Sequence, residues 1–375
     1  MKTIGVRLIG PAGSPSEIGS LIRGAAIGFS ELGIETSLGV TDHQSAPRAT
    51  LDAETAQKLD ILIKTRHSTP FVAIHINNIE AITFVENEAL ANIAWVAPEY
   101  DRIPFIQSLL LQSVPLAEVW APSKRQADML RASMCINPKP VSMVPFGVNV
   151  PKAVQKLDGV TKEGHFYFST ACIPDLNSGI DILLDAFYSE FSKDEKVHLL
   201  WKPILNSIKP EEREKVASGL LNRFKKDSKA SVICFTENQN DKFLDSMFLS
   251  SNCFVAPYRA CGWGDMPMRA MACGIKVISN INTFNNSRMT HEVATMLTSK
   301  NMKIADVNWI MNNSIYQDCS WWEISKENLA KAMRVAYQDG ISNTYASTTS
   351  SMIGKHQWTS VLMDAIANLK KYGEK

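Results

Sequence analysis

The chain has 375 residues, of which 45% are hydrophobic and 21% are charged, and its formal net charge is +1 at pH 7. This length is more than one hydrophobic core usually serves, so it predicts about two domains. The near-zero charge gives no strong field that would draw the chain to nucleic acid or anionic lipid, and no apolar run approaches the length of a membrane span. Seven cysteines without a C-x-x-C pair favour free thiols, no zinc site and a reducing compartment, the cytoplasm.

The first 150 residues alternate between apolar strands and amphipathic helices. Thr3–Ile9 is expected to be a strand, since its apolar stretch is too short for a signal peptide. Glu17–Leu32 has a single apolar stripe and stops before Gly33, which predicts a helix. Ser123 and Gln126 make a capping box for a helix that reaches about Ser133. Further strands are predicted at Phe71–Ile76, Asn92–Ala97, Leu116–Trp120 and Val141–Val144.

The same alternation restarts after a polar stretch at 151–164, which we interpret as an interdomain linker. Gly179–Phe191 has apolar residues in helical phase, and the chain from about Asp318 is expected to be mostly helical. Strands are predicted at Phe166–Thr170, Val197–Trp201, Ser231–Phe235 and Cys253–Ala256. Strands that alternate with helices indicate parallel sheets covered by helices on both faces, here twice.

The segment Phe254–Ser279 is typical of a strand, a glycine turn, a short helix and a second strand. Gly262 and Gly264 flank Trp263, so the backbone there can adopt a positive φ or allow a ligand to approach closely. Pro267 suits the first turn of a helix, and Gly274 suits the position just after its end. A glycine turn that enters a helix N-terminus favours anions, because unpaired N–H groups and the helix dipole act together. At the carboxyl end of a strand, such a turn lies where open α/β sheets bind ligands.

This segment resembles the donor-site signature of the retaining, family 4-like glycosyltransferases with the two-domain B fold. The residues P-Y-R-A-C-G-W-G-D-M-P-M-R-A-M-A-C-G-I-K-V-I stand in register with that signature, and the matching positions are Pro257, Gly262, Gly264, Pro267 and Ala270–Gly274. Cys261 and Arg269 occupy the positions of the two glutamates of the family. Other similar segments follow in the family's order: Trp95–Glu99 with Ile103-Pro104, Val119–Ser123, Val144–Asn149, Asn177–Asp181, Lys202 and His356–Trp358.

The resemblance implies an α/β fold of two Rossmann-like domains with parallel sheets that face each other across a cleft. Residues 1–150 would form the acceptor-side domain and residues 165–345 the nucleotide-sugar-binding domain. Residues 346–375 would hold a C-terminal helix that crosses back to the first domain.

Glycosyl transfer from a nucleotide sugar builds negative charge on the leaving diphosphate, so cations and helix N-terminal amides must be aimed there. In this family those groups replace a metal, so neither a metal nor a cofactor is expected. Lys202, at the end of a strand, is implied as the main cation, and the alternative is a surface lysine. The usual second cation is missing, because Asn177 and Ser178 carry no charge; Arg259, nearby in the sequence, is a candidate to compensate.

The amides of Gly262–Met266 are expected to face the donor sugar, with a purely structural turn as the alternative. Trp263 would either form a wall of the sugar site or pack in the core. A glutamate at position 269 would accept bonds from the ribose hydroxyls, which the guanidinium of Arg269 cannot do. Cys261 is a weak substitute for the other glutamate. Asp265 would either supply the missing carboxylate or serve as a helix N-cap.

Three candidates belong to the first domain. The loop Gly10–Gly19, with Gly13, lies where the family places a loop against the diphosphate. His75 ends a strand at a position where family members often carry a histidine facing the donor sugar, although a lone histidine there is more often structural. Glu99 would orient an acceptor or be merely solvated. The implied catalytic residues are therefore His75, Lys202 and Asp265, and the donor-binding residues are Gly13, Ser169, Asn177, Lys202, Arg259, Cys261, Gly262, Trp263, Gly264, Met266 and Arg269.

Two functions are consistent with these residues. The first is a metal-independent glycosyltransferase that moves a sugar from a nucleotide-sugar donor to a glycan, lipid-linked glycan, protein or modified nucleic acid; the net charge of +1 gives nucleic acid little support. The second is an inactive, glycosyltransferase-like subunit that binds or stabilises a partner. Retention of Lys202, the glycine turn and His75 favours the first function, and loss of both glutamates favours the second. Arg269 would meet an anionic donor in the first case, and would bridge to Asp265 or another carboxylate of its own domain in the second.

Overall fold

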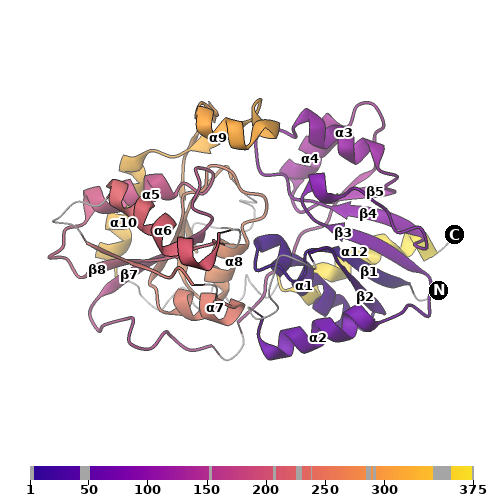
Figure 1. Ribbon diagram of the computed structural model, residues 1–375, viewed down its shortest axis with the longest axis horizontal. Coiled ribbons are helices and arrows are strands. Elements are labelled where there is room, and N and C mark those ends of the chain that lie inside the picture. Colours follow the sequence, from indigo (N-terminus) through magenta and orange to yellow (C-terminus); the bar gives the residue numbers. More distant parts are fainter. Residues whose placement is uncertain are drawn as a thin grey trace. The chain divides into compact units, whose positions relative to one another are not determined.

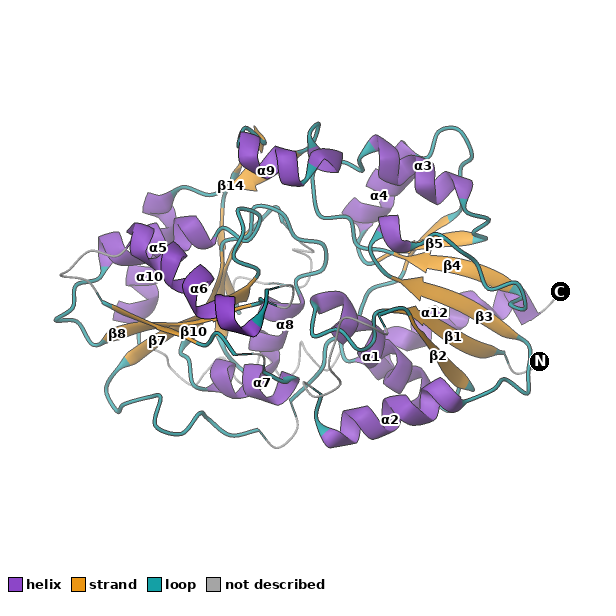
Figure 2. Cartoon of the chain, viewed as in Figure 1, coloured by secondary structure: helices purple, strands orange, loops and turns teal. Residues whose placement is uncertain are grey.

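The computed structural model describes residues 4–42, 51–151, 154–205, 208–224, 230–237, 239–283, 289, 293–340 and 356–373. The chain divides into two compact units. Unit 1 comprises residues 1–149, 310–319 and 354–375, and unit 2 comprises residues 150–309 and 320–353. Each unit has its own parallel six-stranded sheet with helices packed along it (Figures 1 and 2). The predicted α/β class with two parallel sheets is confirmed.

The sheet of unit 1 has the strand order β2-β1-β3-β4-β5-β6, and all its neighbouring strands run parallel. Its strands are β1 (Gly5–Gly10), β2 (Thr36–Val40), β3 (Phe71–Ile76), β4 (Ala91–Trp95), β5 (Glu118–Ala121) and β6 (Val141–Met143). The central strands are buried along most of their length, as expected for a parallel sheet covered on both faces. The predicted start at Thr3 lies outside the described residues, and β2 was not predicted.

The helices of unit 1 are α1 (Glu17–Glu31), α2 (Ala53–Lys64), α3 (Phe105–Ser113), α4 (Lys124–Ser133) and α12 (Trp358–Gly373), with a 3₁₀ turn at Ile79–Ala81 and another at Ser314–Tyr316. The predicted capping box at the start of α4 is confirmed. The Ser123 hydroxyl accepts from the Gln126 backbone N–H at 3.3 Å and donates to the Gln126 side chain at 2.7 Å. The first of these bonds satisfies a backbone donor that the first turn of a helix otherwise leaves unpaired, and the second holds the two side chains together.

Helix α12 belongs to unit 1, where it packs against α1 although the two helices lie at opposite ends of the sequence (Figure 1). The contact requires glycine at two positions, because a Cβ there would collide with Trp358. A Cβ at Gly24 would lie 2.0 Å from Nε1 of Trp358, and a Cβ at Gly147 would lie 2.5 Å from the same indole. Trp358 is therefore seated against backbone that only glycine leaves open.

Gly24→Ala is expected to destabilise the protein by about 1–3 kcal/mol, because the added methyl group overpacks the contact with Trp358. Urea unfolding of the purified protein measures the change. Gly219→Ala is the matched control, since a Cβ at Gly219 in a helix of unit 2 would meet nothing within 4 Å. The control should gain stability from the higher helix propensity of alanine. Equal stability of the Gly24→Ala protein and its parent would contradict the assigned packing.

The sheet of unit 2 has the strand order β12-β11-β10-β7-β8-β9, again with parallel neighbours. Its strands are β7 (Phe166–Cys172), β8 (Val197–Pro203), β9 (Ser231–Cys234), β10 (Cys253–Ala256), β11 (Lys276–Asn280) and β12 (Ala294–Leu297). An antiparallel pair, β13 (Lys300–Lys303) and β14 (Ser320–Glu323), forms a separate two-stranded sheet. The prediction that the chain is mostly helical from Asp318 is confirmed by the helices Lys326–Gln338 and Trp358–Gly373, and β14, whose residues Ser-Trp-Trp-Glu pair with β13, is the exception.

The helices of unit 2 are α5 (Ile180–Glu190), α6 (Pro210–Phe224), α7 (Asp241–Leu249), α8 (Asp265–Ala272) and α10 (Lys326–Gln338). Helix α9 (Val307–Asn312) lies where the chain passes from unit 2 into the 310–319 segment of unit 1. In that segment the ring of Tyr316 lies 4.4 Å from the ring of Tyr100, and Gln107 donates to its hydroxyl at 3.1 Å. Among the described helices, none is both long and apolar enough to cross a membrane.

Candidate functional site

Each sheet has one point where the strand order reverses direction. In unit 2 it lies between β7 and β10, because the chain continues from β7 to β8 and β9 on one side and places β10 on the other. In unit 1 the same reversal lies between β1 and β3. Open α/β sheets bind ligands outside the carboxyl ends of their strands at such points. In unit 2, the loop after β7 carries Asn177 and the loop after β10 carries the Gly262–Gly264 turn. In unit 1, the loop after β1 carries Gly13, and His75 is the second-last residue of β3.

The two loops at the reversal in unit 2 are fastened together. The Arg259 backbone N–H donates to the Asn177 carbonyl at 2.8 Å. Gly179, the N-cap of α5, has a φ of +65°, and a Cβ there would lie 2.2 Å from the Pro257 carbonyl oxygen. Glycine is needed at position 179 both for its backbone angle and for this close approach. The Asn177 loop and the Pro257–Gly264 loop are thus held together at the carboxyl edge of the unit 2 sheet.

The side chain of Arg259 also holds these two loops together. Its Nε donates to Glu323, its NH1 donates to the Leu176 carbonyl and to Asp181, and its NH2 donates to Asp181 and Glu323. These bonds use all five N–H groups of the guanidinium. A diphosphate could therefore be bound by Arg259 only if these bonds broke, so the structure does not support Arg259 as the substitute for the missing second cation.

The glycine turn and α8 have the local geometry expected from the sequence. Gly264 has a φ of +82° and is the N-cap of α8, and Gly274, with a φ of +77°, follows the helix end. Asp265 is the first residue of α8, so its alternative interpretation as the N-cap is wrong. The side chains of Trp263 and Asp265 are 2% and 1% exposed. Cys261 and Met266 are also buried. Burial fits Trp263 as a packed residue.

Arg269 is 1% exposed and is held by α7. Its NH1 donates to the Asp241 carboxylate at 3.0 Å, and its NH2 donates to the Asp245 carboxylate at 2.8 Å and to the Asp241 carbonyl at 3.0 Å. Burial raises the pKa of the Asp245 carboxyl, and the guanidinium opposes that rise. Asp265 adds a further favourable charge to the surroundings of Arg269. Arg269 is thus neutralised within unit 2.

Lys202 lies near the end of β8, level with Ala171 of β7 in the sheet register. It is 5% exposed, and its Nζ donates to the Pro203 carbonyl at 2.9 Å. Burial lowers the pKa of Lys202 to about 8, with Cys234 and Glu237 raising it and the positive charge of Arg213 lowering it further. A lysine held in this way gains most from an anionic partner, because the anion offsets the cost of burying its charge.

Ser169 is the donor-side candidate that the structure does not bring to the edge. It pairs with Leu200 in the register, two residues before Lys202 along β8. Its side chain is fully buried, and its hydroxyl lies 2.8 Å from the hydroxyl of Ser251. The Ser169 hydroxyl is therefore used in the interior of unit 2 and does not reach the carboxyl edge of the sheet.

In unit 1, His75 lies beside Ile9 and Ala94 in the register and is 2% exposed. Its Nε2 lies 3.0 Å from Oδ1 of Asn92, which also accepts from the Glu86 backbone N–H at 2.8 Å. Because that oxygen is an acceptor, Nε2 must carry the proton, which leaves Nδ1 as the unprotonated nitrogen of the neutral ring. Burial lowers the pKa of His75 and favours this neutral form.

The other unit 1 candidates lie at the same carboxyl edge. The Gly13 backbone N–H donates to Asp42 at 3.3 Å, and Arg23 braces the loop from beneath by donating to the Ala12 and Ser14 carbonyls. Glu99, beyond the end of β4, is exposed, and its negative charge contributes to raising the pKa of Tyr316, for which burial is the main cause.

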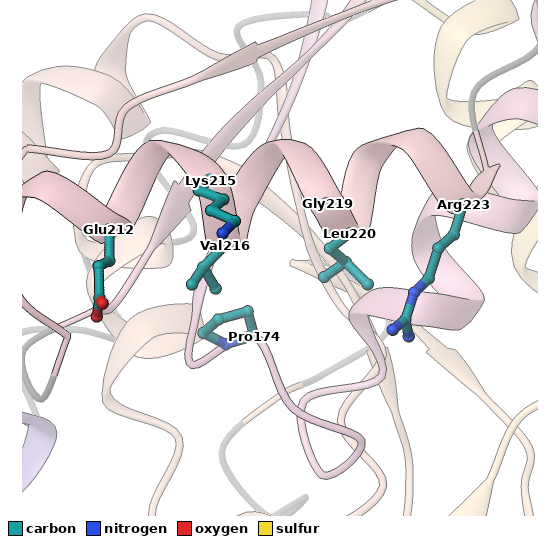
Figure 3. A pocket seen from close by; sticks show the side chains of 7 residues that line it. All are labelled: Pro174, Glu212, Lys215, Val216, Gly219, Leu220 and Arg223. Atoms are coloured by element: carbon teal, nitrogen blue, oxygen red, sulfur yellow. The ribbon is translucent and has the colours of Figure 1, made fainter.

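Two surface pockets are lined by none of these candidates. One of about 530 Å³ lies between α6 and Pro174, with Val216 and Leu220 directed toward that proline (Figure 3). The other, of about 460 Å³, lies between α5 and α10. Among the described residues, no group of histidine, cysteine, aspartate and glutamate side chains is arranged to hold a metal ion.

Solved structures of similar shape identify the fold. HepE from Anabaena, solved with UDP-glucose, aligns with a TM-score of 0.62 at 11% identity, covering 98% of this chain and 100% of that one. Sucrose-phosphate synthase from Thermosynechococcus elongatus aligns with a TM-score of 0.62 at 13% identity and 98% coverage of both chains. The N-terminal domain of a Candida albicans trehalose-6-phosphate phosphatase aligns with a TM-score of 0.57 at 9% identity, covering 99% of this chain and 98% of that one. These likenesses show two Rossmann-like domains of the glycosyltransferase B fold.

No protein-family model matches the sequence, and no curated protein matches it either. The site residues therefore rest on their geometry and on the sequence resemblance.

Proposed function

We propose that this protein is a metal-independent glycosyltransferase of the cytoplasm that binds a nucleotide-sugar donor at the carboxyl edge of the unit 2 sheet. One observation carries the proposal: the Asn177 loop and the Gly262–Gly264 turn follow the two strands between which the strand order of that sheet reverses, and Lys202 lies near the carboxyl end of the neighbouring strand β8. HepE, which shares the fold, was solved with UDP and with UDP-glucose, which supports a nucleotide sugar as the ligand.

The chemistry asked of this edge is stabilisation of the leaving diphosphate. Lys202 supplies a cation whose charge is poorly compensated, since its Nζ donates to a single carbonyl among the described residues. The N-terminus of α8 adds backbone N–H groups and the positive end of a helix dipole behind the Gly264 cap. Together they would lower the free energy of the transition state as charge develops on the phosphate oxygens.

Unit 1 would contribute to the acceptor side. His75 holds an unprotonated Nδ1 that can accept a hydrogen bond from a sugar hydroxyl, and the Gly13 loop brings backbone close to the carboxyl edge of β1. Glu99, which is exposed, would orient the acceptor hydroxyl. The acceptor class stays open among glycan, lipid-linked glycan, protein and modified nucleic acid.

Arg269 favours a second candidate function, an inactive subunit that keeps the fold. Its guanidinium is bonded to Asp241 and Asp245, so it meets no anionic donor in this arrangement, and it cannot accept bonds from ribose hydroxyls. A donor site without a carboxylate at position 269 must hold the nucleoside by other groups or not at all.

Thermal unfolding against a panel of UDP-, GDP-, ADP-, TDP- and CMP-sugars tests the proposal. One member of the panel should stabilise the protein, by about 2.7 kcal/mol at a hundred times its Kd. Release of the free nucleoside phosphate from that donor, with or without acceptor, distinguishes the enzyme from the inactive subunit. Stabilisation by no member of the panel would contradict donor binding, and binding without any release over a full screen of acceptors would support the second candidate.

A further inference from the structure

Helix α6 carries a cation on the stripe that faces the interior of unit 2. Its buried residues are Arg213 and Ala217, four positions apart and therefore on one face of the helix. Arg213 is 7% exposed, although an amphipathic helix normally presents apolar side chains on such a stripe. Its Nε donates to the Ile208 carbonyl at 3.0 Å. Within the described parts of the chain, its two terminal amino groups have no protein acceptor, and neither is among the fully enclosed atoms that lack a partner, so both are open to solvent or to a ligand.

Arg213 lies at the carboxyl edge of the sheet. Strand β8 leads directly into the loop before α6, and pairing continues beyond the strand, since the Ile204 N–H donates to the Cys172 carbonyl at 2.8 Å. The bond to Ile208 turns the Arg213 side chain back onto this loop. Lys202 lies at the end of the same strand, close enough for the positive charge of Arg213 to act on it. Two buried cations therefore occupy one side of the reversal between β7 and β10.

This arrangement is costly unless an anion joins it. Neighbouring like charges repel, and each loses hydration on burial. Other buried arginines of unit 2 show how this chain compensates such charges: Arg259 and Arg269 each have two carboxylates within hydrogen-bond distance. Arg213 has none among the described residues. Of these three arginines, Arg213 alone has neither a carboxylate partner nor an acceptor for its terminal amino groups among the described residues, whereas Arg269 lacks a partner only at Nε.

We propose that Arg213 is the second cation of a diphosphate-binding pair with Lys202, replacing the charge that Asn177 and Ser178 lack. This inference rests on the proposed donor site and adds a binding residue to it. The planar fork of the guanidinium grips two phosphate oxygens, while Lys202 acts as a point charge. The pair should therefore bind a diphosphate more tightly than a monophosphate, because a diphosphate offers each cation its own phosphate group.

Binding of nucleoside diphosphates and of their monophosphates to the full-length protein tests this assignment by calorimetry. The probes are UDP, GDP and ADP, the matching monophosphates, and inorganic pyrophosphate. Arg213→Gln should weaken diphosphate binding by about 10- to 100-fold and monophosphate binding much less, so the ratio of the two affinities falls. Arg213→Lys should be intermediate, since it keeps the charge but not the fork. Arg223→Gln is the matched control, because Arg223 lies on the exposed face of α6 that lines the pocket in Figure 3; it should bind as the parent does.

The outcomes separate this inference from the function beneath it. If the parent binds diphosphates and Arg213→Gln keeps both affinity and ratio, Arg213 is not a ligand and the donor site stands. If Arg213→Gln lowers the unfolding midpoint but leaves the affinity ratio unchanged, its only role is to hold Ile208, and the inference is overturned. If the parent binds neither nucleoside diphosphates nor pyrophosphate, the donor site itself is absent and Arg213 has no anion to bind. Should the glutamine variant fail to fold, the affinity ratio of the lysine variant decides.

Discussion

Arg269→Met is expected to destabilise the protein by about 3–5 kcal/mol. Arg269 is 1% exposed and its guanidinium neutralises Asp241 and Asp245. Removing the guanidinium leaves the Asp245 carboxylate buried and unpaired and takes a partner from the partly exposed Asp241, which costs far more than the pair itself contributes. Burial already raises the pKa of Asp245 and the guanidinium opposes that rise, so the variant should keep a proton on this carboxyl at a higher pH than the parent does. Urea unfolding measures the loss.

Two further variants make this result specific. Arg334→Met removes an arginine that also bridges two carboxylates, Glu190 and Glu195, but its side chain is 25% exposed. Solvent screens that cluster, so the loss should be about 1 kcal/mol. Adding Asp245→Asn to Arg269→Met should recover part of the stability, because the buried carboxylate is gone. A loss below about 1 kcal/mol for Arg269→Met alone would show that the cluster does not carry the stability assigned to it.

The carboxylates around Arg269 determine how a glutamate can be introduced at position 269, where the resembling family has one. Arg269→Glu would place a fourth carboxyl group beside Asp241, Asp245 and Asp265, so the single variant is expected to be unstable. Restoring the glutamate while also making Asp241→Asn and Asp245→Asn removes the repulsion. Only that triple variant can show whether a ribose-binding carboxylate strengthens nucleotide affinity.

Lys202→Met is expected to make the protein more stable and to weaken its binding of nucleoside diphosphates about 10- to 100-fold. Burial lowers the pKa of Lys202 from its ordinary 10.5 to about 8. Between these pH values the unfolded chain binds more protons than the folded one, so the free energy of unfolding rises with pH there. At pH 7 the charged lysine therefore costs the fold up to about 3 kcal/mol, which methionine removes.

The free energy of unfolding and the diphosphate affinity, each measured across pH, test whether Lys202 lowers stability while it strengthens binding. The stability gain of Lys202→Met should be about 1–3 kcal/mol at pH 7 and should shrink as pH rises through 8 toward 10.5, where both states of the parent lose the proton. Diphosphate affinity of the parent should fall above pH 8, whereas Lys202→Arg, whose charge does not titrate there, should bind without that fall. A Lys202→Met protein that is markedly less stable than its parent at pH 7, or that binds diphosphate equally well, would contradict the role of Lys202.

Local patterns predicted the elements whose causes are local. The bounds of β3 and β10 match those predicted, and Gly264 and Gly274 adopt the positive φ angles that the ends of α8 require. Strand β2 was missed because its Thr-Ser-Leu-Gly-Val sequence is short and only half apolar. Strand β14 was missed because its stability comes from pairing with β13 across a gap in the sequence that no local pattern reveals.

The candidate site was predictable only as far as motifs reach. The glycine turn and Lys202 could be predicted because each lies at the end of a predicted strand, and the structure places both at the carboxyl edge of the unit 2 sheet. The carboxylate partners of Arg259 and Arg269 lie 24 to 78 residues away in the sequence, so pairing of these cations within the unit could not be inferred from spacing. Arg213 left one signal, a charge on the otherwise interior stripe of α6, which becomes meaningful only when its unused donors are known.

A crystal structure of the protein with the nucleotide sugar that stabilises it would test the central claim most directly. We expect the diphosphate at the carboxyl edge of the unit 2 sheet, with phosphate oxygens within hydrogen-bond distance of Lys202 Nζ and the Arg213 guanidinium. The sugar would then lie against the backbone of the Gly262–Gly264 turn. A nucleotide bound in the α6 pocket at Pro174, or in the pocket between α5 and α10, with Lys202 still donating to the Pro203 carbonyl and touching no phosphate, would contradict it.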